Sequence, residues 1–295
     1  MYGILPSLTV MLASERIDTS LNLSGLTDYE HITATFPSCW CSSPGPLTLP
    51  VNEVHVWRAA LNLTAVDLNR LRDTLCPEER ARAARFRFAR DRDHFIAGRG
   101  VLRNILAGYL RREPARLHFS YGQFGKPALA SNCGADDLRF NLSHSDGLGL
   151  FAFARLREVG VDVERVDPCI EVDQLVERFF SPHEIHNLHT LPRDAQLEAF
   201  FLCWTRTEAY LKACGEGLVG SGSFNLLLAQ GEAACAVRCR NSLWSLLPLR
   251  PAPSYVANVA AEGRDWNVRL WQWQVLPTIN RVAPPSGRAS RFSGC

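Results

Sequence analysis

The sequence predicts an α+β protein of two similar halves, each a small antiparallel sheet with a long helix, that meet near residue 165. Three observations carry this prediction. A long helical segment followed by strand-like runs occurs twice, apolar and polar residues alternate within the runs, and turn-forming residues separate them. With 295 residues, 46% of them hydrophobic, the chain can also bury a sizeable core, which excludes a disordered or collagen-like class.

The first half is expected at residues 51–165. Residues 53–57 (EVHVW) alternate as a strand does, and residues 92–110 place apolar side chains at helical intervals. Ser, Asp and Gly turn signals then separate three short runs that predict an antiparallel sheet, at 138–143, 148–154 and 159–164.

The second half is expected at residues 166–276. Ser181, Pro182 and Glu184 form a capping box with proline at the first helical position, which predicts the start of a helix. A long amphipathic helix and two strands should follow, at 194–213, 254–260 and 267–275.

The two ends of the chain lack this periodicity. Residues 1–50 are rich in Ser, Thr, Leu and Pro and end in a turn-forming SSPGP run, so we expect an extension or linker. Residues 277–295 contain PPSG and SGRASRFSG, which predict a disordered tail.

Charge and cysteine usage favour a cytoplasmic chain. The formal net charge of +2 provides no global attraction to nucleic acid or membrane. No stretch reaches the roughly 18 uninterrupted apolar residues of a membrane helix, and the opening lacks a basic leader. Ten cysteines are scattered without the paired spacing of zinc sites, which indicates reduced thiols.

Lysine is rare in this chain, and each lysine is therefore a candidate for a specific role. There are 30 arginines and only two lysines, Lys126 and Lys212. An ammonium is a compact point charge that suits a single phosphate oxygen, so both lysines are candidate phosphate ligands. Chance remains the competing explanation for two occurrences.

Three acidic residues are candidate metal ligands. Asp162 and Glu164 are two apart in a strand, so both carboxylates project from one face about 7 Å apart, within reach of one cation such as Mg²⁺. Glu208 shares a helix face with Trp204 and Lys212. A solvated strand face and an ordinary exposed Glu–Lys pair are the alternatives.

Two further segments could bind phosphate. Residues 140–145 (FNLSHS) end a strand in a turn that could direct Ser143 and His144 at a phosphate, although a histidine there can also be an ordinary turn residue. Eight arginines lie between Arg80 and Arg103. They could bind phosphate or nucleic acid, or form a charged helix face with internal ion pairs.

Taken together, the motifs resemble those of the Sfp-type 4'-phosphopantetheinyl transferases. The resemblance covers roughly residues 52–275 and rests on the order and spacing of five segments: FGKPAL at 124–129, FNLSHS at 140–145, GVDVE at 160–164, FFSPHE at 179–184 and WTRTEAYLKACGEGL at 204–218. It implies two similar α+β halves with the active site in the cleft between them.

The resemblance also implies an activity. Such enzymes transfer the 4'-phosphopantetheine arm of coenzyme A to a serine hydroxyl of an apo acyl, peptidyl or aryl carrier protein, and they release adenosine 3',5'-bisphosphate. Coenzyme A and the carrier protein are then the partners, with no nucleic acid and no membrane. Two halves in one chain favour a monomer.

Residue roles follow from the same resemblance. Mg²⁺ would be held by Asp162, Glu164 and Glu208, and Glu208, or a water that it orients, would be the general base. Lys212 would assist catalysis and bind phosphate. The remaining coenzyme A contacts would come from Lys126, Ser143, His144 and an arginine of the Arg82 and Arg85 cluster.

One position departs from the family pattern. Where the family usually reads WTxKEA, this chain has Thr207 directly before Glu208, so a lysine that could touch phosphate is missing. A catalytically weak or silent relative that binds coenzyme A is therefore an alternative, and an arginine-rich RNA-binding module is a more distant one.

Overall fold

The computed structural model describes residues 29–32, 39–43, 45–122, 125–180, 182–215, 234–239 and 242–275. The tail expected to be disordered, residues 277–295, lies outside the described residues, as does Ser181 of the expected capping box.

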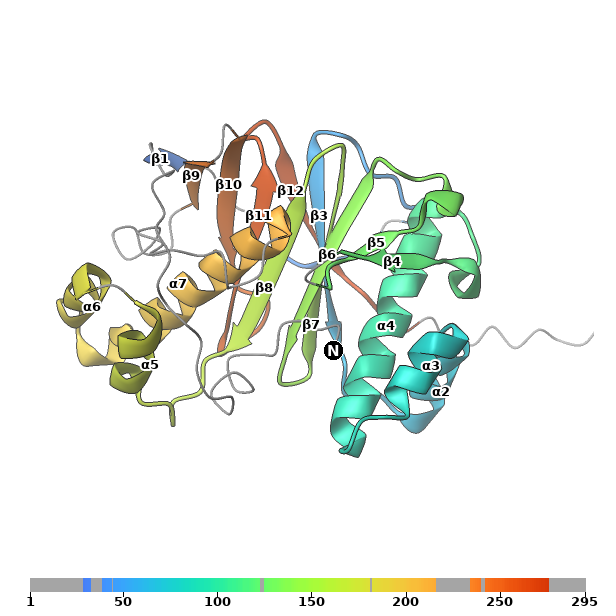
Figure 1. The fold of residues 1–295 in the computed structure, drawn as a ribbon, viewed down its shortest axis with the longest axis horizontal. Coiled ribbons are helices and arrows are strands. Elements are labelled where there is room, and N and C mark those ends of the chain that lie inside the picture. Colours follow the sequence, from blue (N-terminus) through green and yellow to red (C-terminus); the bar gives the residue numbers. More distant parts are fainter. Residues whose placement is uncertain are drawn as a thin grey trace, which may run out of the picture.

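The described residues form helices and strands in alternating groups (Figure 1). The strands are β1 (Tyr29–Ile32), β2 (Cys41–Ser42), β3 (Glu53–Ala60), β4 (Phe119–Tyr121), β5 (Pro127–Leu129), β6 (Leu138–Ser145), β7 (Leu148–Arg155), β8 (Val159–Arg165), β9 (Ala234–Cys239), β10 (Ser242–Leu249), β11 (Tyr255–Glu262) and β12 (Asn267–Gln272). The helices are α2 (Ala65–Asp73), α3 (Pro77–Ala83), α4 (Ala89–Leu110), α5 (Val172–Phe179), α6 (Pro182–His189) and α7 (Arg193–Cys214), with short 3₁₀ turns at Pro114–Arg116 and Ser131–Cys133.

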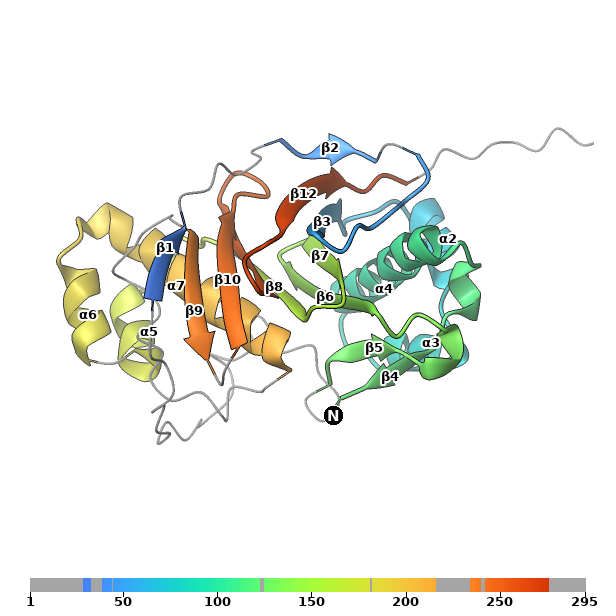
Figure 2. The same ribbon diagram turned by 90° about the horizontal axis from the view of Figure 1, so that it is seen from above.

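Two five-stranded sheets lie side by side, and each has a long helix (Figures 1 and 2). The strand order of the first sheet is β2-β12-β3-β7-β6, and that of the second is β1-β9-β10-β11-β8. The edge strands β6 and β8 contact each other where the sheets meet. This confirms the α+β class with two similar halves.

The core between the sheets explains how β8 is oriented. Alternate residues of β8, Val161 and Val163, are fully buried against apolar side chains of the first sheet, including Val54, Val56 and Leu150. Because side chains alternate along a strand, Asp162 and Glu164 project to the opposite face of β8. That face is covered by α7, which contacts both β8 and β11.

Glycine allows α7 to lie unusually close to β8. A Cβ atom at Gly160 would lie 2.1 Å from the carbonyl oxygen of Ala209 on α7, which no side chain can tolerate. The helix therefore rests on the bare backbone of β8. Glu208 and Lys212 directly precede the contacting residues Ala209 and Ala213 along α7, and they are thereby brought next to the carboxylates of β8.

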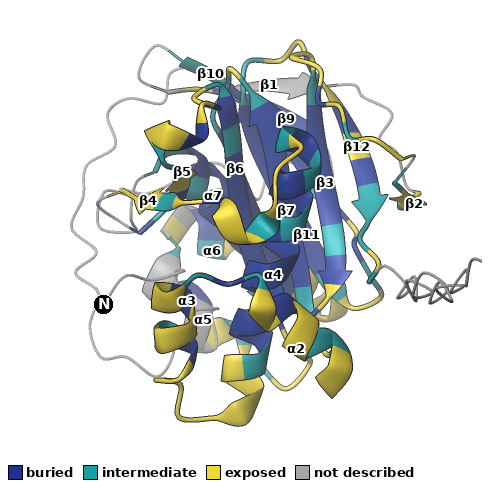
Figure 3. Ribbon diagram, turned by 90° about the vertical axis from the view of Figure 1, so that its right-hand side faces the viewer, coloured by how far each residue is buried: buried dark blue, intermediate teal, exposed yellow. Residues whose placement is uncertain are grey.

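The helix α4 buries its apolar side against the first sheet. Val101, Leu102, Ile105 and Leu106 pack with aromatic residues of β6 and β7, as the helical spacing at 92–110 predicts. In Figure 3 the strands β3, β6 and β7 are mostly buried, while α2 and α3 expose much of their surface.

Strand pairing differs from the expected division of the chain. The strand predicted at 159–164 forms backbone hydrogen bonds with β11 rather than with β6 or β7, so it belongs to the second sheet. The strand predicted at 267–275 runs parallel to β3 in the first sheet. The halves thus exchange strands across residue 165, and the first sheet is not purely antiparallel.

Two short strands lie within residues 1–50, the segment expected to be an extension or linker. Within it, β1 pairs with β9 and β2 pairs with β12, so it adds an edge strand to each sheet. Leu47 and Leu49 also pack against the core of α4.

Among the described residues, none of the helices is sufficiently long and apolar to span a bilayer.

Candidate active site

Two buried carboxylates on β8 are each held by a serine of β6. Asp162 is 3% exposed and Glu164 is 4% exposed. Ser143 Oγ lies 2.7 Å from Asp162 Oδ1, and Ser145 Oγ lies 2.7 Å from Glu164 Oε2. The edge strands β6 and β8 are therefore joined by hydrogen bonds between serines and carboxylates, at the junction between the halves.

The helix α7 adds a lysine and a third carboxylate to this place. Lys212 Nζ lies 2.6 Å from Asp162 Oδ1 and 3.1 Å from Ser143 Oγ. Glu208 is one helical turn before Lys212 and is 3% exposed. The alternatives of a solvated strand face and an exposed helix pair do not hold, because all four side chains are largely withdrawn from water.

Burial and crowding of charge shift the protonation of this cluster. Burial, together with the charges of Asp162 and Glu164, raises the pKa of Glu208 to about 8, although Lys212 lowers it. Burial alone would lower the pKa of Lys212, but the carboxylates of Asp162 and Glu208 raise it above its ordinary value. The lysine is therefore charged and neutralises part of the acidic cluster.

The donor set fits a hard cation. Asp162 Oδ2 and Glu208 Oε1 are buried and accept no hydrogen bond from the described residues, so each has a lone pair available for a ligand. Carboxylate oxygens are the ligands that Mg²⁺ prefers. In the described part of the chain, no three His, Cys, Asp or Glu side chains are yet close enough to hold a metal, and Lys212 is the cation next to Asp162.

His144 adjoins the same cluster. Burial and the charge of Lys212 lower the pKa of His144 to about 4. The imidazole is therefore neutral at physiological pH, and it can act as a hydrogen-bonding group rather than as a permanent cation.

The other lysine is engaged at a different point. Lys126 Nζ lies 2.9 Å from Glu158 Oε2 and 2.8 Å from the carbonyl oxygen of Ala213 in the last turn of α7. No hydrogen bond within the described residues joins Lys126 to Asp162, Glu164 or Glu208. It instead connects the first half of the chain to the carboxyl end of α7.

Arg82 belongs to a second cationic cluster, on the helices of the first half. Its guanidinium stacks over Phe95 at 5.1 Å, and the nearby charges of Arg99 and Arg85 add to burial in lowering its pKa. Arg99 is only 3% exposed and donates to Tyr121 Oη at 2.7 Å. Arg85 is exposed. The buried carboxylate of Glu79 pairs with Arg99 and Arg103 and neutralises part of this charge, so Arg82 and Arg85 are the members left as candidates for an anionic ligand.

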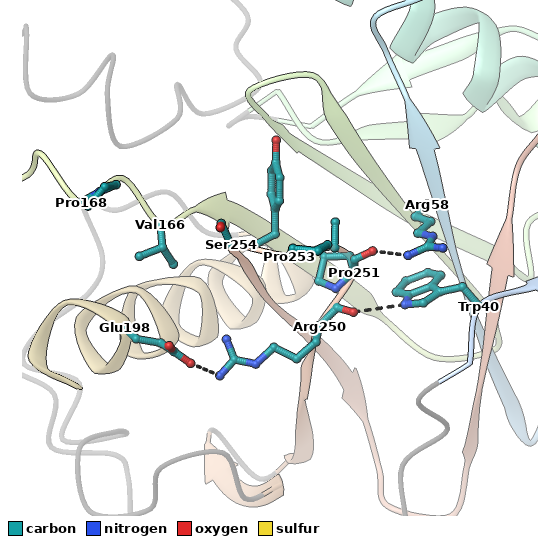
Figure 4. A pocket seen from close by; sticks show the side chains of 11 residues that line it. Trp40, Arg58, Val166, Pro168, Glu198, Arg250, Pro251, Pro253 and Ser254 are labelled. Carbon is teal, nitrogen blue, oxygen red and sulfur yellow. Dashed lines mark hydrogen bonds and ion pairs between the residues drawn. The ribbon is translucent and has the colours of Figure 1, made fainter. Parts of the chain in front are cut away.

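A pocket of about 770 Å³ lies elsewhere, between the end of β8 and the β10–β11 turn (Figure 4). Arg250, from that turn, pairs with Glu198 on α7, and the indole of Trp40 donates to the Arg250 carbonyl. None of the residues that the sequence marks as candidates lines this pocket. The acidic cluster, rather than the pocket, is therefore the candidate active site.

Sequence reasoning missed several of these residues. Ser145 is two positions from Ser143, and the same alternation that pairs Asp162 with Glu164 could have pointed to it. Arg99 lies within the arginine-rich run that the sequence marks, but nothing singles it out there, and Tyr121 gave no signal because a tyrosine in a short strand is ordinary. Their roles depend on contacts between distant segments.

Comparison with known proteins shows the family to which the chain belongs. Residues 62–154 match a family model described as 4'-phosphopantetheinyl transferase, N-terminal, and residues 158–260 match the 4'-phosphopantetheinyl transferase superfamily. The chain is 41% identical over 234 residues to the 4'-phosphopantetheinyl transferase HetI of Nostoc sp., which covers 79% of this chain and 98% of the relative.

More distant relatives carry the same activity in their names. The chain is 26% identical over 206 residues to the 4'-phosphopantetheinyl transferase Sfp of Bacillus subtilis, covering 69% of this chain and 89% of Sfp. It is 31% identical over 166 residues to L-aminoadipate-semialdehyde dehydrogenase-phosphopantetheinyl transferase of Xenopus laevis, covering 54% of each chain. Because the match to HetI extends over nearly the whole of that relative, this chain belongs to the 4'-phosphopantetheinyl transferase superfamily and is an enzyme of that type.

Proposed function

We propose that this enzyme transfers the 4'-phosphopantetheine arm of coenzyme A to a serine hydroxyl of an apo carrier protein, in a reaction that requires Mg²⁺. The observation that carries the proposal is the buried cluster of three carboxylates and one charged lysine where α7 rests on β8. The transfer breaks a bond between two phosphates of coenzyme A. Cationic groups at the site must neutralise the negative charge on both phosphates.

Asp162, Glu164 and Glu208 would hold the cation. They supply oxygen ligands, and Asp162 Oδ2 and Glu208 Oε1 are without hydrogen-bond partners among the described residues. Bound Mg²⁺ would supply neutralisation of the negative charge that develops on the leaving phosphate. It would also keep Glu208, whose pKa is about 8 without a metal, in its ionised form at neutral pH.

The remaining residues would bind coenzyme A. Lys212 would exchange part of its contact with Asp162 for a phosphate oxygen, and neutral His144 would donate a hydrogen bond to the phosphates. Ser143 would do so by turning its single hydroxyl proton from Asp162 to a phosphate oxygen. Lys126, whose ammonium lies next to the carboxyl end of α7, would bind a phosphate there. The cationic cluster of Arg82 and Arg85 would receive the 3'-phosphate of the nucleotide.

The nucleophile of this reaction comes from the carrier protein and not from this chain. The serine oxygen of the carrier protein forms a bond to the phosphorus that bears the pantetheine arm, and the bond from that phosphorus to the pyrophosphate bridging oxygen breaks. Glu208 takes the serine proton, directly or through a water, and adenosine 3',5'-bisphosphate leaves. Positioning and charge neutralisation supply most of the acceleration.

The cellular setting follows from the chain's thiols and its organisation. The described cysteines are free thiols, which suits the reducing cytoplasm. Both halves of the site lie in one chain, so we expect a monomer. Coenzyme A and a carrier protein are the proposed partners, and neither nucleic acid nor a membrane is part of this proposal.

The test is a mass measurement on carrier proteins. The enzyme is incubated with coenzyme A, Mg²⁺ and a panel of apo acyl and peptidyl carriers, and each carrier is weighed. The expected result is a mass increase of one phosphopantetheine arm on at least one carrier, lost with chelator. An Asp162→Asn variant that modifies carriers at the wild-type rate would contradict the proposed site.

A further inference from the structure

The two sheets are joined at β6 and β8 by side chains rather than by a backbone ladder. Asn141, Ser143 and Ser145 alternate along one face of β6, and all three are buried. Asn141 Oδ1 accepts the backbone N–H of Val161 at 2.9 Å, while the two serines contact the carboxylates of β8. One row of polar side chains on β6 thus connects the two halves along the junction with β8, where the candidate site lies.

The hydroxyl of Ser145 has a determined direction. Its oxygen accepts the backbone N–H of Arg165 at 3.2 Å, and it lies 2.7 Å from Glu164 Oε2. A backbone N–H can only donate, so the single hydroxyl proton is left for the carboxylate. Ser145 therefore donates to Glu164, while its oxygen accepts from the backbone of Arg165.

Ser143 repeats this arrangement one step along the strand. Its oxygen accepts from the ammonium of Lys212 at 3.1 Å, which can only donate, and its proton is directed at Asp162 Oδ1, 2.7 Å away. Each carboxylate of β8 is consequently held through one oxygen by a serine of β6. For Asp162, the second oxygen is the buried one that has no hydrogen-bond partner within the described part of the chain.

We propose that Ser145 is a positioning residue that fixes the carboxylate of Glu164 for a divalent cation bound through carboxylate oxygens. This inference rests on the proposed function. A glutamate side chain has several rotatable bonds, so a ligand that is already held loses less freedom when the cation binds. Ser145 touches neither coenzyme A nor the reacting atoms in this account. Its effect is exerted through Glu164.

The test measures metal binding directly, with Mn²⁺ as the probe and the free enzyme as the sample. Titration of wild type, Ser145→Ala and Ser145→Thr is followed by electron paramagnetic resonance of unbound Mn²⁺. The alanine variant should bind Mn²⁺ about tenfold more weakly, the usual scale for a lost partner of a metal ligand. The threonine variant keeps the hydroxyl and should bind within about threefold of wild type.

The chain offers a matched control for the loss of a buried serine hydroxyl. Ser245 is 2% exposed and donates to the carbonyl oxygen of Gly263 at 2.8 Å, on β10 and away from the carboxylates. Ser245→Ala should bind Mn²⁺ as wild type does. If Ser145→Ala does not fold, Ser145→Cys keeps the size of the side chain and replaces the strong donor by a weak one, and it should show the same loss.

The outcomes separate this inference from the function on which it rests. If Ser145→Ala binds Mn²⁺ as tightly as the wild-type enzyme does, the positioning role of Ser145 is overturned, while the proposed metal site stands. Equal losses in Ser145→Ala and Ser245→Ala would overturn that role as well, because the effect would be general loosening. A wild-type enzyme that binds no Mn²⁺ would overturn the proposed metal site itself.

Discussion

The ammonium of Lys212 on α7 lies 2.6 Å from Oδ1 of Asp162 on β8, and the two side chains are 10% and 4% exposed. This contact joins the long helix of the second half to the edge strand at the junction of the sheets. A buried charge pair of this kind is rarely kept for stability alone, because desolvation offsets much of the attraction. The pair is better understood as part of the site.

Replacement of Lys212 tests this view. We expect Lys212→Ala to lower kcat/KM for coenzyme A by roughly ten- to a thousandfold, the scale of a lost charge-assisted hydrogen bond to phosphate. The rate of carrier modification measures the effect. Arg116→Ala is the control, since its ion pair with Glu113 is exposed. Wild-type kinetics in Lys212→Ala would make the residue an ordinary helix lysine.

The pKa of Glu208 predicts an unusual dependence of stability on pH. The folded enzyme without metal holds the Glu208 proton up to about pH 8, while the ordinary pKa of a glutamate in an unfolded chain is 4.5. A raised acid pKa contributes stability that is complete below pH 4.5 and declines as pH rises through about 8. Removing this ionisable group should therefore stabilise the enzyme only at the alkaline end.

Urea unfolding of wild type and Glu208→Gln in chelator measures this effect. We expect similar free energies of unfolding near pH 5 and an advantage of roughly 4 kcal/mol for the glutamine variant near pH 8. The same variant should be inactive in carrier modification, because it lacks the proposed base. An advantage that is equal at both pH values would show that Glu208 titrates as an ordinary carboxyl.

Local periodicity was enough to predict the parts of this site that lie within one element. Alternation along β8 placed Asp162 and Glu164 on one face, and helical spacing placed Glu208 with Lys212. Pairing between segments distant in sequence could not be predicted. The strand at 267–275 has the same pattern whether it pairs with β11 or with β3, and β1 and β2 are too short to give a periodic signal.

The contact at Gly160 is a second case that only the folded chain reveals. A Cβ atom there would meet backbone of α7, which cannot move as a flexible side chain could. We expect Gly160→Ala to lower the free energy of unfolding by about 3 kcal/mol, because overpacking forces the helix away from β8. Activity should fall with it, since Glu208 and Lys212 move with the helix.

Gly98 provides the opposite expectation and serves as the control for Gly160. It lies inside α4, and a Cβ atom there would have no neighbour within 4 Å. Gly98→Ala should raise the free energy of unfolding by about 0.5 to 1 kcal/mol through helix propensity. Chemical denaturation measures both variants. Equal effects at the two glycines would contradict the close packing of α7 on β8.

Thr207 occupies the position at which the family usually has a lysine. Thr207 is half-buried on α7, and its hydroxyl donates to the carbonyl oxygen of Cys203 at 3.1 Å, a local bond that contributes little to the site. Thr207→Lys should fit the helix, because lysine has the higher helix propensity. Its side chain leaves the helix about 100° from that of Glu208, and a long stem can still bring the ammonium to the same polyphosphate.

We therefore expect Thr207→Lys to lower KM for coenzyme A and to make it more sensitive to salt, since the gain is electrostatic. The choice of carrier protein should stay unchanged. Thr207→Gln is the matched control, because it adds length without charge and should leave the salt dependence as in wild type. KM measured at low and high ionic strength distinguishes the variants. Weaker coenzyme A binding in Thr207→Lys would show that threonine is adapted to this site and that no phosphate contact is missing there.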